Sequence, residues 1–426
     1  MNDNSESLAM PAATSHDVLT DVLRDGAQRL LAQTIEAEVA SWIDHHSHIV
    51  DGAGHRLVVR NGHLPTRSIV TGVGTVQVRR GRIHDRRIVG ENKLGEPIDA
   101  DGHPVERFRS RILPPYLRKT KSLEELIPWL YLKGVSTGAF TEALQALLGP
   151  SATGLSATTI TRLVATWQND YEAWNKRSLR EKRYVYVWAD GVHFNVRLEE
   201  DRQCILVLMG ATAEGGKELI AVADGYRESE QSWRQLLLDC KQRGLTVDPK
   251  LATGDGALGF WKALRQVYPT TRTQRCWVHK TANVLDKMPR RVQPNAKEML
   301  HQIWMASSRA DAEAAFDAFV EMYEPKYPKA AACLKKDRDV LLTFYDFPAQ
   351  HWMHVRTTNP IESTFATVRL RHRKTKGSGS RRACLAMVFK LMESASKTWR
   401  ALNGSALVAD VIAGVQFVDG VRKNAA

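Results

Sequence analysis

Four carboxylates are the residues of this 426-residue sequence best placed to bind a divalent metal. Asp190, Asp224 and Asp255 each precede a glycine and follow an apolar run. No other carboxylate follows Glu362 until Glu393, although seven Lys and Arg residues lie between Glu362 and position 382. Asp-Gly is a common turn dipeptide, so each aspartate taken singly also fits a plain turn.

The elements that would position these acids form a recognisable order. Residues 184–194, 204–215 and 217–226 are predicted to be three successive strands, followed by a helix over 229–244. A strand at 251–257, a helix at 258–269 and a strand at 271–280 follow. Three consecutive strands and then strand–helix repeats are typical of an α/β core of ribonuclease-H-like type, with a mixed sheet and helices on both faces.

The expected strand order, third–second–first–fourth–fifth, separates the three aspartates. Asp190 would end the first strand and Asp255 the fourth, and these strands would be parallel neighbours about 4.8 Å apart. Their carboxylates could then share a metal. Asp224 would end the third strand, roughly 10 Å away, so we assign it to a turn.

A third carboxylate is needed to complete such a metal site, and Glu362 is the candidate. The stretch from Asn359 through Pro360 to Glu362 also fits an ordinary helix start, with Asn as the N-cap and Glu in the first turn. On that alternative, Glu362 only closes the end of a helix.

The helix that Glu362 would begin favours a larger role. At 100° per residue, Glu362, Arg369, Arg373 and Lys376 fall on one helical stripe. A row of cations leading away from a metal-binding acid suits a phosphodiester strand, because the cations would neutralise its backbone along the track. We therefore expect these three cations to contact DNA.

Paired acids of this kind suit two-metal phosphoryl transfer. Two ions per active site, Mg²⁺ or Mn²⁺ by the preference of oxygen ligands, would be held by Asp190, Asp255 and Glu362. One ion activates the nucleophile and the other stabilises the leaving oxygen. These three acids are the predicted catalytic and metal-binding residues.

The N-terminal part of the chain is strongly basic. Residues 1–16 look disordered by composition, and residues 17–121 are expected to form a helix followed by a β segment. Residues 56–121 contain 15 Lys and Arg against 6 Asp and Glu, a net charge of +9 out of +13 for the whole chain. Such a tract is either a solvated surface or a zone of contacts to the DNA backbone, and its clustering favours DNA.

Residues 122–180 contain helix signals separated by glycine-containing turns. A helix-turn-helix and a plain helical bundle both fit this pattern. If it is a helix-turn-helix, the third helix would contact DNA through Thr158, Thr159 and Arg162.

Four motifs in order resemble the Mutator-type DDE transposases of bacterial insertion sequences. They are WADGVHF at Asp190, ATGDGALGFWKAL at Asp255, RCWVHK, and RTTNPIESTFATVRLRHRKTKGSGSR at Glu362. The spacings of 65 and 107 residues between the acids leave room for the helical insertion of this family, here residues 281–346. Residues 181–280 and 347–426 would then form the catalytic core.

The resemblance implies binding of terminal inverted repeats and Mg²⁺-dependent cleavage and strand transfer, with a circular intermediate thought to form in the family. Cys276 and His279 form a CxxH pair that belongs to the family signature. A zinc site needs four ligands, so packing or hydrogen bonding near the active site is the better interpretation of this pair. His279 could also orient a phosphate or the attacking hydroxyl.

Composition argues against a membrane protein and against a secreted, disulfide-linked protein. No apolar run is long enough to span a membrane, the first residues do not read as a signal peptide, and five scattered cysteines favour a reducing cytoplasm. Because a transposase joins two ends, we expect a homo-oligomer, at least a dimer, on DNA. The alternatives are a structure-selective nuclease that cuts without joining and a non-catalytic DNA-binding regulator.

Overall fold

The computed structural model describes residues 18–133, 135, 139–148, 157–196, 203–225, 227–256, 258–374 and 380–423. Residues 1–16, expected to be disordered, and the predicted contact residue Lys376 lie outside these ranges. The chain divides into two compact units, Met1–Thr159 and Ile160–Ala426. Within the described ranges, no helix is long and apolar enough to cross a membrane, and all five cysteines are free thiols.

The first unit combines one long helix with short strand pairs. The helix α1 (Val18–His45) precedes the antiparallel pairs β1 (Val58–His63) with β4 (Gly81–Asp85), β2 (Arg67–Thr71) with β3 (Gly74–Val78), and β5 (Gly90–Glu91) with β6 (Pro97–Ile98). Ile35 of α1 is buried with Ile69, Val76, Val78 and Leu113. This apolar contact fixes the helix on the β2–β3 pair.

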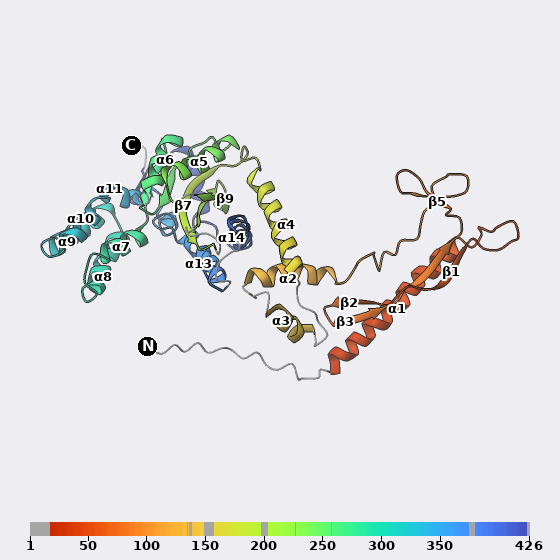
Figure 1. The fold of residues 1–426 in the computed structure, drawn as a ribbon. Coiled ribbons are helices and arrows are strands. Elements are labelled where there is room, and N and C mark those ends of the chain that lie inside the picture. Colours follow the sequence, from red (N-terminus) through yellow and green to blue (C-terminus); the bar gives the residue numbers. More distant parts are fainter. Residues whose placement is uncertain are drawn as a thin grey trace. The chain divides into compact units, whose positions relative to one another are not determined.

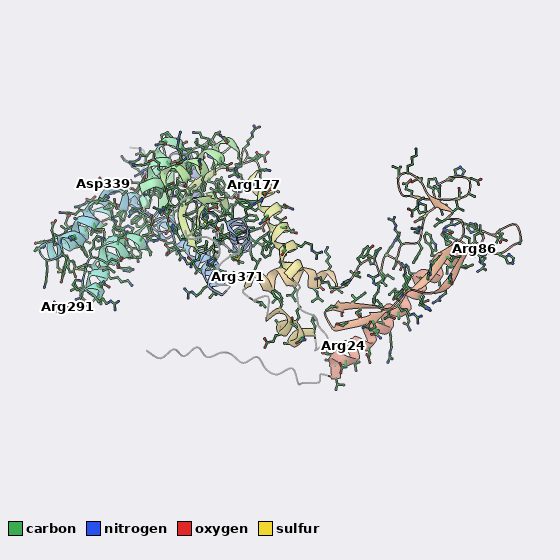
Figure 2. The ribbon with its side chains drawn as sticks, viewed as in Figure 1. Arg24, Arg86, Arg177, Arg291, Asp339 and Arg371 are labelled. Carbon is green, nitrogen blue, oxygen red and sulfur yellow. The ribbon has the colours of Figure 1, made fainter. Side chains whose placement is uncertain are left out.

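The basic tract lies in the strands and loops of this unit. Some of its arginines are committed to the fold, since Arg87 pairs with Asp85 at 2.7 Å and Arg67 donates to the Leu117 carbonyl at 2.7 Å. Others are exposed, among them Arg82 and also Arg86, which Figure 2 labels. Exposed cations on a folded support are available to a polyanion.

Three helices follow the basic tract. They are α2 (Lys121–Lys133), α3 (Ala139–Leu148) and α4 (Ala157–Asn175). Leu123 of α2 is buried together with Leu144 and Leu148 of α3, so these two helices share one core. The helix α4 begins in the first unit and runs into the second.

The second unit is organised around a five-stranded mixed sheet of order β11-β10-β7-β8-β9. The strands β7 (Tyr184–Phe194), β8 (Gln203–Thr212) and β9 (Lys217–Gly225) are antiparallel, whereas β10 (Leu251–Gly254) and β11 (Arg272–Arg275) run parallel to β7. This is the strand order expected from the sequence, and it is confirmed. Every residue of β8 is buried, which explains its continuous apolar run.

Helices cover both faces of this sheet (Figure 1). On one face, Val187 and Ala189 of β7 lie in a core with residues of α5 (Glu230–Gln242) and α6 (Leu258–Val267). The other face is covered by α13 (Asn359–Lys374), which contacts β7, and α14 (Arg381–Ser396), which contacts β9. Because side chains alternate along a strand, Asp190 shares the second face with Trp188.

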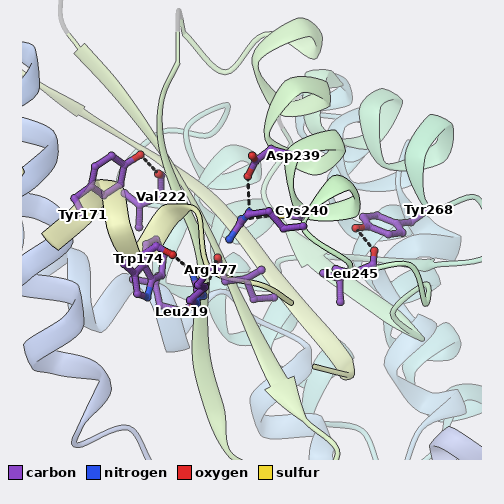
Figure 3. A network of polar contacts seen from close by, with 11 residues as sticks. Tyr171, Trp174, Arg177, Leu219, Val222, Asp239, Cys240, Leu245 and Tyr268 are labelled. Atoms are coloured by element: carbon purple, nitrogen blue, oxygen red, sulfur yellow. Dashed lines mark hydrogen bonds and ion pairs between the residues drawn. The ribbon is translucent and has the colours of Figure 1, made fainter. Parts of the chain in front are cut away.

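The C-terminal half of α4 is anchored to the outer strand of the sheet (Figure 3). The Tyr171 hydroxyl donates to the Val222 carbonyl at 2.8 Å, and Arg177 donates to the Leu219 carbonyl at 2.7 Å. The Arg177 guanidinium also lies over the Trp174 ring, 3.8 Å from its centroid. The cation–π contact and the two hydrogen bonds hold this end of the helix against β9.

Between β11 and α13, every element is helical: α7 (Trp277–Leu285), α8 (Gln293–Met305), α9 (Arg309–Tyr323), α10 (Pro328–Lys335), α11 (Arg338–Leu341), η1 (Thr343–Asp346), η2 (Ala349–His351) and α12 (Trp352–Val355). The strand predicted over 271–280 was too long. It ends at Arg275 because Cys276 is the N-cap of α7. The chain closes with η3 (Ser405–Leu407), α15 (Val408–Ala413) and the pair β12 (Phe417–Val418) and β13 (Val421–Arg422).

Side chains on the second face of the sheet hold the segment that leads into α13. The Trp188 indole donates to the His354 carbonyl at 2.9 Å, and the Thr253 hydroxyl donates to the Val355 carbonyl at 2.6 Å. The Tyr186 hydroxyl lies 2.8 Å from Nδ1 of the fully buried His351. These hydrogen bonds fix the start of α13 relative to β7 and β10.

Replacing Tyr186 by Phe tests this attachment. His351 Nε2 lies 3.1 Å from the Gly404 carbonyl and must donate to it, so Nδ1 accepts from Tyr186. Tyr186→Phe leaves a buried acceptor unpaired and should lower the free energy of unfolding by about 1–3 kcal/mol, measured by urea denaturation. Tyr184→Phe is the control, because its hydroxyl meets the partly exposed Glu218 and water can replace it. Equal losses in both variants would contradict the interpretation.

Candidate active site

Asp190 and Asp255 lie side by side at one end of the parallel strand pair. The register pairs Ala189 of β7 with Gly254 of β10, so the next residue of each chain is an aspartate on the second face of the sheet. Asp190 is only 7% exposed. The sequence led us to expect Asp190 at the end of its strand. Instead, Asp190 lies inside β7, because pairing with β8 extends β7 to Phe194, beyond the end of β10.

Glu362 lies in the first turn of α13. Its Oε1 accepts a hydrogen bond from the Thr358 hydroxyl at 2.7 Å. The expected N-cap, Asn359, is itself the first residue of the helix, and Thr358 stands before it. The Thr358 amide in turn lies 3.3 Å from the Cys276 sulfur. The helix start is thereby attached to the N-terminus of α7.

Cys276 and His279 stand between the sheet and Glu362. His279 Nδ1 lies 3.5 Å from Glu362 Oε1 and 3.4 Å from the Thr358 hydroxyl. The buried Cys276 sulfur lies 3.3 Å from the same hydroxyl. The donor atoms of Cys276, His279 and Glu362 are within 4.8 Å of one another, three where a closed zinc site needs four. A hydrogen-bonded support for Glu362 explains this arrangement better than a zinc site.

The charges of these groups act on one another. Burial raises the pKa of Asp190 to about 7, which His279 opposes and Asp255 and Glu228 reinforce. The nearby Cys276 thiol raises the pKa of His279 to about 9 against the effect of burial, and the charges of Asp190 and Glu362 add to the rise. His279 is therefore a cation at neutral pH, within electrostatic range of both Asp190 and Glu362.

Comparison with known proteins identifies the family. A family model described as "Transposase, Mutator family" matches residues 2–401. The chain belongs to the Mutator family of transposases. The resemblance drawn from four sequence motifs is thereby confirmed.

Curated relatives of this transposase agree. The chain is 54% identical over 298 residues, 70% of this chain and 92% of the relative, to "Transposase for insertion sequence element IS6120" of Mycolicibacterium smegmatis. It is 50% identical over 290 residues, 66% of this chain and 96% of the relative, to "Transposase for insertion sequence element IST2" of Acidithiobacillus ferrooxidans. The structure titled "Drosophila P element transposase strand transfer complex" aligns with 74% of this chain and 87% of its own at 8% identity, and its TM-score of 0.29 is too low to support a shared fold.

Asp224 of the transposase has a different partner. It lies within β9 rather than in a turn, and its carboxylate pairs with the Arg381 guanidinium through contacts of 2.6 and 2.9 Å. This bidentate ion pair joins β9 to the start of α14. The turn assigned to Asp224 was wrong, because this residue lies in β9 and pairs with Arg381.

The structure describes the side chains of only some of the predicted DNA-contact residues. Arg369 and Arg373 are exposed on α13, and Arg369 lies over the Phe365 ring at 5.7 Å from its centroid. Arg371, which was not expected on this stripe, is buried at 2% exposure, and Figure 2 labels it. Arg162 is exposed on α4, whereas the side chains of Thr158 and Thr159 lie outside the described part of the chain.

Glu228 is the residue that the sequence analysis missed. It precedes Ser229, the N-cap of α5, so in the sequence it looks like an ordinary acid at a helix start. Burial raises the pKa of Glu228 to about 7, the charge of Asp255 adds to the rise and His279 opposes it. Glu228 therefore interacts electrostatically with Asp190 and Asp255.

Replacing Asp190 by Asn should stabilise the transposase in the absence of metal. The Asp190 carboxyl has its pKa raised to about 7 in the folded state, so its ionised form opposes folding. The resulting free-energy penalty on folding is absent below pH 4, grows between pH 4 and pH 7, and is constant above pH 7. Three pH units correspond to about 4 kcal/mol, an upper limit for the gain at pH 8. Urea denaturation in EDTA at pH 8 and at pH 4 measures it.

Asp224→Asn is the matched control for this experiment. It removes an ion pair and should lower the free energy of unfolding by about 1 kcal/mol or less at pH 8. If Asp190→Asn lowered the free energy of unfolding by the same amount at pH 8 and at pH 4, electrostatic strain at Asp190 would be ruled out.

Proposed function

We propose that this transposase binds the terminal inverted repeats of an insertion sequence and cleaves and joins DNA strands at a site formed by Asp190, Asp255 and Glu362. Two observations support this most: the strand register sets Asp190 of β7 beside Asp255 at the end of β10, and the His279 imidazole, on which the charge of Asp190 acts, lies 3.5 Å from Glu362. The mixed sheet order supports a catalytic core of ribonuclease-H-like type.

The residues fit the divalent ions that such chemistry requires. All three proposed ligands offer carboxylate oxygens, the donors that Mg²⁺ and Mn²⁺ prefer. Asp190 is buried among like charges, an unfavourable state that a bound cation relieves. Two bound ions would activate a water or 3′-hydroxyl nucleophile and stabilise the leaving oxygen.

The chain itself supplies orientation and charge. Thr358 holds the Glu362 carboxylate, and the charged His279 lies where a phosphate oxygen could approach it. The exposed Arg369 and Arg373 on α13 are proposed to follow the DNA backbone away from the acids. The basic tract of residues 56–121 and the helix bearing Arg162 are proposed to bind the element ends, and two ends require at least a dimer on DNA.

A structure-selective nuclease would use the same acids but would cut without joining. A non-catalytic regulator would bind the same ends without any metal-dependent step. The family membership favours a transposase over both. A labelled duplex carrying one element end distinguishes them, since only a transposase transfers the cut 3′ end to a target.

Neutralising the acids should separate chemistry from binding. Asp190→Asn, Asp255→Asn and Glu362→Gln should each lower Mg²⁺-dependent cleavage and joining at least 1000-fold, while binding to the element ends in a gel-shift assay is retained. Asp224→Asn should keep both activities. Joining by the triple variant at the wild-type rate would refute the assignment of these acids.

Removing the cations of α13 should weaken binding in a salt-dependent way. If Arg369 and Arg373 each neutralise one phosphate, replacing each by Ala lowers the steepness of log K against log salt concentration by about 0.9, measured by fluorescence anisotropy on a cleaved end. Arg265→Ala, an exposed arginine on α6, is the control. An unchanged slope in the double variant would exclude the proposed DNA track.

A further inference from the structure

Glu228 is held in place by tight backbone packing. A Cβ atom at Gly259 of α6 would lie 2.5 Å from the Glu228 carbonyl oxygen and 2.6 Å from the Glu230 nitrogen. Only glycine permits so close an approach of α6 to this loop. Arg227, the residue before Glu228, has a φ of +58°, a conformation that costs a non-glycine residue energy. The chain therefore turns sharply at Arg227 and is fixed at Glu228.

The Glu228 side chain extends across Gly191. A Cβ atom at Gly191 would lie 2.6 Å from Glu228 Oε1 and 2.7 Å from its Cγ and Cδ atoms. Gly191 directly follows Asp190, and the missing side chain at position 191 leaves the space that the Glu228 carboxylate occupies. Two glycines, Gly259 and Gly191, thus leave room for Glu228.

Within the described part of the chain, His279 is the positive group that acts on Glu228. Among the residues that the structure describes, no Lys or Arg side chain forms an ion pair with Glu228, which is half-buried. The charges that act on it are those of Asp255 and His279, and its own charge acts on Asp190. A half-buried carboxylate beside two others is unfavourable unless a cation joins them.

We propose that Glu228 is a fourth carboxylate of the acidic site and binds a divalent cation together with Asp190 and Asp255. This inference rests on the proposed function, because it assumes that Asp190 and Asp255 hold a metal. It adds a ligand that comes from the loop before α5, and it explains both glycine contacts.

A different use of Glu228 is also open to test. Its carboxylate lies within 4.8 Å of the donor atoms of His193 and Cys204, which are cross-strand partners on β7 and β8. Burial raises the pKa of the Cys204 thiol to about 12, so this sulfur is a neutral thiol before any metal binds. Three carboxylates suit Mn²⁺ better than this mixed set.

Mn²⁺ binding to the full-length, DNA-free protein tests the proposal. Calorimetric titration at pH 7.5 should show that Glu228→Gln loses one Mn²⁺ or binds at least tenfold more weakly. Gly191→Ala should weaken binding in the same direction with every carboxylate intact, because its methyl group displaces the Glu228 side chain. Glu230→Gln, two residues away and beside Lys262, should bind Mn²⁺ like the wild type. Thermal unfolding in EDTA checks that each variant is folded. If Glu228→Gln does not fold, Glu228→Asp, which draws the carboxylate back by one methylene, replaces it.

The outcomes distinguish this proposal from the one on which it rests. If Asp255→Asn loses Mn²⁺ but Glu228→Gln and Gly191→Ala bind it like the wild type, Glu228 is not a ligand and the proposed function stands. If Asp190→Asn and Asp255→Asn also bind Mn²⁺ fully, the proposed function itself fails. If His193→Ala weakens Mn²⁺ binding as much as Glu228→Gln while Asp190→Asn does not, Glu228 belongs to the His193–Cys204 set and the proposal is overturned.

Discussion

The acidic site depends on how residues 351–358 are hydrogen-bonded to the face of the sheet that carries Asp190. Glu362 follows Asp255 by 107 residues, and closing a loop of that length costs on the order of 4 kcal/mol. The hydrogen bonds of Tyr186, Trp188 and Thr253 with this segment, each worth about 1 kcal/mol, offset that cost together with apolar packing. The same contacts decide where α13 begins, and hence where Glu362 lies.

The sheet and the loop before α5 bring together acidic groups that repel one another. Asp190, Asp255 and Glu228 carry like charges in a partly buried space, and the positive charge of His279 relieves only part of the repulsion. The surrounding packing must therefore hold the acids in place. A rigid acidic site that is unfavourable when empty binds a cation more tightly, because the cation removes a strain that folding has already imposed.

The sequence predicted those features that depend on periodicity and strand order. Continuous apolar runs marked the strands, and neighbouring parallel strands placed Asp190 beside Asp255. It predicted the first strand over residues 184–194 correctly but set Asp190 at its end, whereas pairing with β8 continues β7 beyond Asp190 to Phe194. It also missed Glu228, because the contact with Gly191 joins residues 37 positions apart and leaves no local pattern.

Two acids near the end of β9 show what decides such roles. Asp224 and Glu228 are four residues apart, and nothing in their local sequence ranks one above the other as a metal ligand. Arg381 of α14 meets Asp224, so the chain itself supplies the cation and the pair becomes part of the fold. The turn at Arg227 instead directs Glu228 over Gly191 toward other acids. An acid whose counter-charge comes from its own chain stabilises structure, whereas one that is buried among acids requires a cation from outside.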